Sequence, residues 1–130
     1  MLSLTIHNLG DVTVFRCAGR ITAEDRDVLR NAVSSRPGMR IAVLDLAEVS
    51  AMDAAGLGTL LFLRRWAKDT GKELKLMNLL PRVEELLELT KLRSSFEVCS
   101  VRDMVDLLCR ATRQGKFAIP DANSPALQSA

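Results

Sequence analysis

The middle of the chain combines a strand-like run with a helical run, and this pairing restricts the fold to a few layered architectures. Residues 41–46 are apolar and include β-branched side chains, as expected of a strand covered on both faces. Residues 57–68 carry apolar side chains at helical spacing. Between the two runs, Asp53 is suited to cap the helix by accepting N–H groups of its first turn. A strand that leads directly into a capped helix favours the α/β class.

The flanking sequence continues the alternation of strands and helices. The predicted elements are strands at residues 2–7 and 12–18, a helix capped by Thr22, a strand at 40–46, a helix from Asp53 to about Thr70, a strand at 74–77, a helix from Pro81, a short strand at 96–98 and a helix capped by Ser100. We expect one α/β domain over residues 1–114, with a mixed, largely parallel sheet of four or five strands and about four helices. Residues 115–130 lack periodicity and are predicted to be a flexible C-terminal tail.

Helical periodicity also predicts which side chains are buried. The expected apolar faces are Val28, Leu29, Ala32 and Val33 on the first helix, and Met104, Val105 and Leu108 on the last. On the second helix, Gly56, Thr59, Leu60, Leu63 and Ala67 share the predicted core face. The three cysteines, Cys17, Cys99 and Cys109, lack metal-type spacing and are odd in number. We expect them to be small buried hydrophobes of a protein in a reducing compartment.

The segment Asp53-Ala54-Ala55-Gly56-Leu57-Gly58 resembles the signature of the STAS family, the domain of anti-sigma factor antagonists. That signature is a hydrophobic strand followed by Asp-Ser-Ser-Gly-Leu-Gly. Further similarities are the turn at residues 19–22, the Gly-x-x-Leu pattern at residues 71–74 and the helix start at residues 81–83, so the resemblance covers nearly all of residues 1–114. The chain departs from the family pattern at Ala54 and Ala55, which replace both serines, and at Thr22, where many members have Asp.

This resemblance implies a role for position 54. In phosphorylated members of the family, a partner anti-sigma kinase modifies the first serine after the Asp. The helix N-terminus favours negative charge there, but Ala54 has no hydroxyl and is predicted not to be phosphorylatable. Ser50 and Thr59 are the nearby hydroxyls. Ser50 precedes the cap and Thr59 points inward on the projection, so neither replaces position 54 convincingly, and Ser50 is the better candidate.

The second helix also carries a possible docking surface. Ala54, Leu57 and Leu61 project among the cations Arg64, Arg65, Lys68 and Lys72. Residues 47–51 form a loop over Leu57, or the leucines are isolated exposed apolar residues, or the three residues form an apolar stripe with a basic rim. The resemblance favours the stripe, because it implies that the partner contacts this helix and the turn after the second strand. The candidate partner-binding residues are Arg20, Thr22, Ser50, Asp53, Ala54, Leu57, Gly58, Leu61 and Arg64. Gly56 is expected to allow close helix–sheet packing, and Gly58 to leave room for a partner's backbone.

Other classes of function find little support in the sequence. Asp45, Glu48 and Asp53 are close in sequence, but no histidine completes a ligand set, so we expect no metal, catalytic residue or cofactor. Residues 1–109 contain equal numbers of acidic and basic side chains, which argues against a nucleic-acid partner. No apolar run approaches the roughly 20 residues of a membrane span, and no signal segment is evident. We therefore expect a cytoplasmic protein without membrane insertion.

Three functions remain open. The leading one is a non-enzymatic regulator that binds an anti-sigma factor or a kinase-fold regulatory protein and, lacking a phosphorylatable residue 54, is constitutively binding-competent. The second is a STAS subunit of a lipid-transport ABC system or a scaffold of a stress-signalling complex. The third belongs to another class, a nucleotide- or anionic-ligand-binding α/β domain that uses the helix N-terminus at Asp53. The sequence leaves the oligomeric state undetermined.

Overall fold

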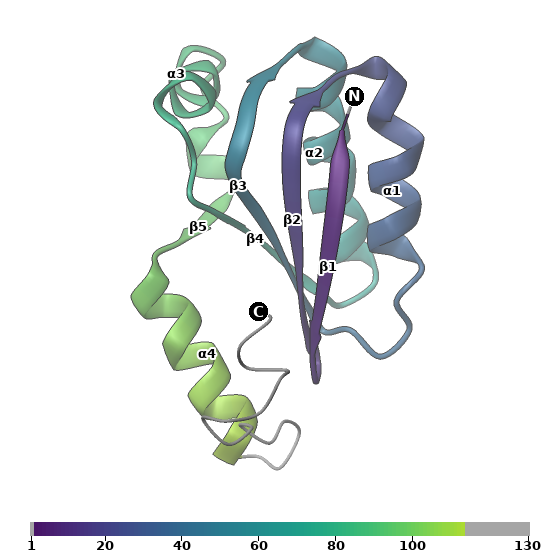
Figure 1. The fold of residues 1–130 in the computed structure, drawn as a ribbon, viewed down its shortest axis with the longest axis vertical. Coiled ribbons are helices and arrows are strands. Elements are labelled where there is room, and N and C mark those ends of the chain that lie inside the picture. The colour runs from purple at the N-terminus through teal and green to yellow at the C-terminus, as the bar shows by residue number, and fades with distance from the viewer. Residues whose placement is uncertain (1, 114–130) are drawn as a thin grey trace.

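A computed structural model describes residues 2–113 of the chain, and Figure 1 shows their arrangement. These residues form the strands β1 (Ser3–Leu9), β2 (Val12–Ile21), β3 (Ile41–Met52), β4 (Glu73–Met77) and β5 (Glu97–Cys99). The helices are α1 (Arg26–Ser34), α2 (Ala54–Asp69), α3 (Pro81–Leu89) and α4 (Val101–Arg113). Single 3₁₀ turns at Ala23–Asp25 and Arg93–Ser95 precede α1 and β5. The predicted tail, residues 115–130, lies outside the described residues.

The five strands form one sheet in the order β1-β2-β3-β4-β5. β1 and β2 are antiparallel, and every other neighbouring pair is parallel. Gly10, at the first central position of the two-residue β1–β2 turn, has a φ of 76°, as a type II′ hairpin turn requires. The predicted α/β class, the mixed sheet and the number of helices are thereby confirmed.

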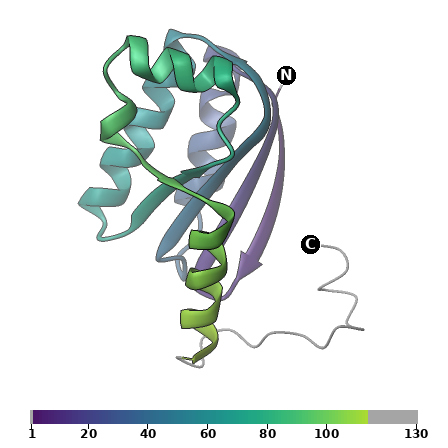
Figure 2. The same cartoon turned by 90° about the vertical axis from the view of Figure 1, so that its left-hand side faces the viewer.

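The helices cover the two faces of the sheet unequally. α1 and α2 run along one face, whereas α4 lies on the other side near the end that holds the β1–β2 turn (Figures 1 and 2). The main core, between the sheet and α1, α2 and α3, includes Phe15, Leu44, Leu60, Leu76 and Leu87. A smaller cluster beneath α4 includes Val14, Val43, Met77, Met104 and Leu107. Strand alternation separates these two sets, because successive side chains point to opposite faces.

β3 is longer than the sequence analysis predicted. It continues from Leu46 to Met52, so residues 47–51 are strand and not a loop over α2. The extension pairs with β2, with Val49 opposite Gly19 and Met52 opposite Ile21, across two shifts of register. These irregularities explain the error, because a β-bulge interrupts the strict alternation on which a strand prediction rests.

The predictions that Val28, Val105 and Cys109 are buried are wrong. Val28 of α1 and Val105 of α4 are 53% and 51% exposed, and Leu107 is buried in α4 where Val105 was expected. On α1 the fully buried side chains are Leu29 and Val33, and on α4 the buried side is shifted to Met104 and Leu107. Cys17 and Cys99 are buried as predicted, but Cys109 is exposed.

Candidate functional site

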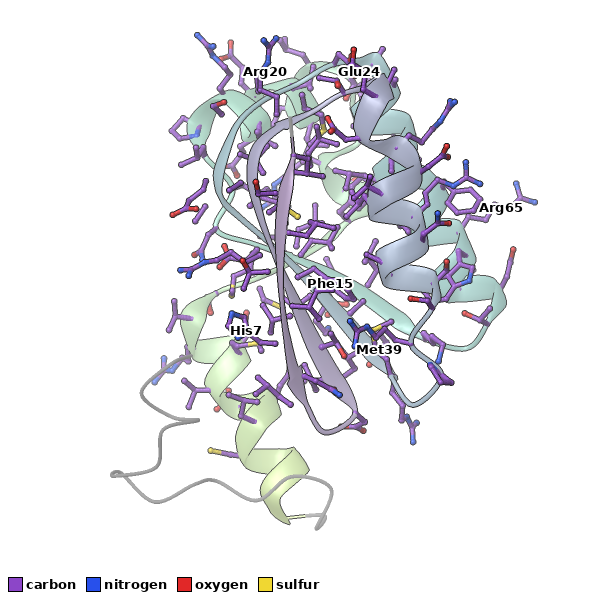
Figure 3. The ribbon with its side chains drawn as sticks, turned by 45° about the vertical axis from the view of Figure 1, so that its right-hand side comes forward. His7, Phe15, Arg20, Glu24, Met39 and Arg65 are labelled. Atoms are coloured by element: carbon purple, nitrogen blue, oxygen red, sulfur yellow. The ribbon has the colours of Figure 1, made fainter. Side chains whose placement is uncertain are left out.

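The candidate site lies where β2 and β3 end and α2 begins. The register of the parallel pair places Arg20 opposite Ala51 and Ile21 opposite Met52, so the turns that follow both strands emerge side by side. This brings together Arg20, Thr22, Ser50, Asp53 and Ala54, which the sequence analysis had selected. Figure 3 shows Arg20 at this end of the molecule, close to Glu24 in the 3₁₀ turn that precedes α1.

Asp53 is the N-cap of α2, as predicted. Its Oδ1 accepts a hydrogen bond of 2.7 Å from the Gly56 N–H, and its own N–H donates to the Ile21 carbonyl at 3.3 Å. The cap therefore fixes the start of α2 to the end of β2. Because the carboxylate already occupies a backbone donor of the first turn, it also stands where an anionic ligand would bind a helix N-terminus, which disfavours the anion-binding alternative.

Ala54 is the first residue of α2, and its methyl group is exposed. Any side chain at this position faces solvent at the positive end of the helix dipole. This is the geometry that a phosphoacceptor needs, without the acceptor atom.

The two nearby hydroxyls differ in accessibility. Ser50 is exposed, and its Oγ donates to the Gly19 carbonyl at 3.3 Å. Thr59 is 1% exposed and donates to the Ala55 carbonyl at 2.9 Å, so the prediction that it points inward is confirmed. Of the two, only Ser50 is open to modification in the folded domain.

The two glycines of α2 have different surroundings. A Cβ on Gly56 would lie 2.2 Å from the Ile21 carbonyl oxygen and 2.8 Å from Cγ of Met52, so Gly56 is required by close packing, as predicted. A Cβ on Gly58 would meet nothing within 4 Å, and Gly58 is exposed. The backbone of α2 is therefore open to solvent at Gly58.

The expected apolar stripe does not form. Leu57 is only 8% exposed and belongs to the main core, and Leu61 is partly buried against the same core. The buried face of α2 is wider than the helical projection indicated, because α1 and β4 contact the helix in addition to the strands β2 and β3. The prediction that Leu57 is exposed is accordingly wrong. Arg64 is exposed but lies ten residues after Ala54, roughly 15 Å along a helix that rises 1.5 Å per residue.

The sequence analysis overlooked one residue that shapes the site. Asp25 accepts hydrogen bonds from the Leu2 N–H (3.0 Å), the Thr22 hydroxyl (3.0 Å) and the Thr22 N–H (3.2 Å). Burial raises the pKa of the Asp25 carboxyl, but these hydrogen bonds outweigh it and hold the pKa below its ordinary value. The signal was present in the sequence, since Thr22 and Asp25 have the spacing of a capping box.

The acidic residues near the site do not form a metal centre. Asp45 lies on the sheet face opposite α2, where its Oδ1 accepts from the Ala47 N–H and from Nδ2 of Asn78, both at 3.1 Å. Its Oδ2 is 3.8 Å from Nε of Arg16. Within residues 2–113, no three His, Cys, Asp or Glu side chains are grouped as metal ligands would be.

Comparison with known proteins identifies the family and the fold. The STAS domain family matches residues 3–106. The unphosphorylated form of the anti-sigma factor antagonist SpoIIAA superposes with a TM-score of 0.69 at 16% identity, over 83% of this chain and 97% of that one. A putative anti-sigma factor antagonist from Thermotoga maritima gives a TM-score of 0.73 at 18% identity, over 82% and 95% of the two chains. A sulfate transporter family protein from Wolinella succinogenes gives 0.67 at 17% identity, over 82% and 93%.

Proposed function

The chain belongs to the STAS domain family, and on that premise we propose that it is a non-enzymatic regulatory domain that binds an anti-sigma factor or a kinase-fold regulatory protein. The contact surface is the end of the sheet where α2 begins, formed by Arg20, Thr22, Ser50, Asp53, Ala54 and Gly58. Structures similar to this chain include SpoIIAA in unphosphorylated and phosphorylated forms. A protein of this kind acts in the cytoplasm, and within residues 2–113 no helix is long and apolar enough to cross a bilayer.

The observation that carries this proposal is the exposed methyl group of Ala54 at the first position of α2. A phosphoryl group there would add about −1.5 to −2 charges to the centre of the contact surface. With alanine that change cannot occur at this position, so the domain stays binding-competent. Its activity is then set by its abundance or by competition with a phosphorylatable relative.

The absence of a side chain at Gly58 also supports a contact surface at the start of α2. Glycine is unfavourable inside a helix by about 1 kcal/mol relative to alanine, and no described atom occupies the space where its Cβ would stand. A partner that approaches the α2 backbone closely at this point makes use of the missing side chain.

Affinity purification from the cells that naturally contain the protein tests the surface. We compare the wild type with Ala54→Glu and Gly58→Gln, and with Arg102→Glu on α4 as a control at an exposed site far along the chain. We expect the wild type and the control to recover a kinase-fold protein and the two α2 variants to lose it. If both α2 variants recover that protein as the wild type does, the contact surface is elsewhere.

A second candidate function follows from the other similar structures. STAS domains of a sulfate transporter family protein and of the murine anion transporter Slc26a9 superpose with TM-scores of 0.67 and 0.66. The chain is alternatively a STAS subunit of a membrane transport system, for example a lipid-transport ABC system. Recovery of a transporter ATPase in the same purification favours this function over the anti-sigma pathway.

A further inference from the structure

A pocket of about 220 Å³ lies outside the proposed contact surface, between the C-terminal half of α2 and the strands β4 and β5. Arg64 and Lys68 line it from the helix, and Lys72 lines it just after the helix ends. We call these three residues the cation row. Ser95 and Leu74 complete the side toward the sheet edge.

The cations of the row are not neutralised by acidic neighbours. Within residues 2–113, neither Arg64 nor Lys68 forms an ion pair, although they stand one turn apart where like charges destabilise a helix. Arg65 and Asp69 are also four residues apart, but they carry opposite charges, and Nε of Arg65 lies 3.8 Å from Oδ2 of Asp69. Figure 3 shows Arg65 on the outer side of the helix layer. The unpaired charges of the row therefore lie toward the pocket and not on the outermost face of α2.

Lys72 holds a fixed position in the row. Its Nζ donates to the Met39 carbonyl, which is an uncharged acceptor. The ammonium group is thus positioned by the backbone, and no acidic side chain within residues 2–113 forms an ion pair with it.

The two acidic residues at the pocket, Glu73 and Glu97, have side chains that point away from the cation row. Leu74 packs against the main core on the α2 side, so strand alternation places the side chain of the preceding Glu73 on the opposite face. Glu97 pairs in register with Lys75 and accepts its Nζ at 2.7 Å. The cation row therefore dominates the electrostatics of the pocket.

We propose that the cation row and its pocket bind an acidic segment of a protein partner. Arg64 and Lys68 stand four residues apart on α2, about 6 Å along the helix, and Lys72 follows where the chain turns back, its N–H donating to the Ala67 carbonyl at 2.7 Å. Alternate side chains of an extended segment lie about 6.6 Å apart on one side, close to the roughly 6 Å rise between residues four apart in a helix. Successive carboxylates of such a segment match successive cations. Among the described residues, no aromatic side chain lines the pocket, which disfavours the stacking of nucleic-acid bases.

This interaction is separate from the contact surface at Ala54. Arg64, the nearest cation of the row, is roughly 15 Å along α2 from Ala54. A segment bound at the pocket leaves the start of α2 free, so one partner could occupy both places or two partners could bind at once.

Fluorescence anisotropy with a fluorescein-labelled hexaglutamate peptide tests the proposal. We compare the full chain with the double variant Arg64→Glu/Lys68→Glu, and with Arg26→Glu/Arg102→Glu, which changes the net charge equally at exposed sites on α1 and α4. Circular dichroism confirms that each variant is folded. We expect the wild type to bind and the binding to weaken with salt. We expect the row variant to bind roughly tenfold more weakly, because favourable surface contacts become repulsive, and the control to stay within about twofold.

Three outcomes would overturn the proposal. They are absence of peptide binding by the wild type, an equal loss in both double variants, and displacement of the peptide by inorganic phosphate at concentrations where chloride of the same ionic strength has no effect. The first shows that the pocket does not bind acidic segments, the second reduces the row to a general charge effect, and the third assigns the pocket to small oxyanions. The assay contains no anti-sigma or kinase-fold protein, so its result is independent of the proposed function.

Discussion

Replacing Gly56 by alanine should destabilise the domain, although alanine is the better helix former. The added Cβ would stand 2.2 Å from the Ile21 carbonyl oxygen, whereas ordinary van der Waals contact begins at 3.4 Å. The start of α2 and the end of β2 must therefore separate by roughly 1 Å. The obstacle is a backbone carbonyl that also accepts the N–H of Asp53, so the separation strains the helix cap as well.

The size of the effect follows from two opposing contributions. Overpacking of a tightly packed core typically costs 1–3 kcal/mol, and a rigid backbone obstacle places this site at about the upper end of that range. The gain in helix propensity offsets about 1 kcal/mol. We expect Gly56→Ala to lower the free energy of unfolding by about 2 kcal/mol.

Gly58→Ala is the matched control, because it makes the same substitution two residues away in open space. We expect it to raise the free energy of unfolding by about 0.5–1 kcal/mol. With urea m-values of about 1–3 kcal/mol/M for small domains, the midpoints of the two variants should differ by roughly 1–3 M. Urea unfolding followed by circular dichroism measures this difference. If Gly56→Ala is as stable as the wild type, the close contact with Ile21 does not exist and the proposed fixed start of α2 is wrong.

Two further predictions concern ionisable groups. The folded-state pKa of Asp25 is lowered, so its contribution to stability is fully present above the unfolded pKa of about 3.9 and is lost as the pH falls through the folded value. Asp25→Asn should therefore lower the free energy of unfolding by about 1–2 kcal/mol at pH 7, and by less near pH 3. An equal decrease at the two pH values would contradict this. Burial raises the pKa of Cys17 to about 12, and that of Cys99 is also raised by burial, whereas Cys109 is exposed. Iodoacetamide at pH 8 followed by mass spectrometry should label Cys109 in the native protein and Cys17 only after unfolding, and fast labelling of native Cys17 would contradict its burial.

Local signals in the sequence were sufficient to predict the order and type of the elements. Asp53, Pro81 and Ser100 mark helix starts by capping and by the preference of proline for the first turn, and all three mark the starts that the structure shows. Gly71, with a φ of 72°, follows the end of α2 as a C-terminal cap does. Each of these signals depends only on residues close in sequence, so it can be recognised without knowledge of the tertiary structure.

The burial of individual side chains on α2 could not be predicted as well from the sequence. Leu57 was assigned to the surface because it projects among cations, but it is 8% exposed, since α2 also packs against α1 and β4. The pocket between α2, β4 and the turn that contains Ser95 likewise depends on segments distant in sequence. Helical periodicity describes one helix, whereas these features depend on how several elements meet.

The central claim is that Ala54 leaves the domain permanently competent to bind its partner. Isothermal titration with the kinase-fold protein recovered by affinity purification tests it, before and after incubation with that protein and Mg-ATP. We expect the wild type to incorporate no phosphate and to keep its affinity, and Ala54→Ser to be phosphorylated and to bind at least about tenfold more weakly, because the new charge lies in the contact surface. Phosphorylation of wild-type Ser50 with loss of affinity, or unchanged affinity of phosphorylated Ala54→Ser, would contradict the claim.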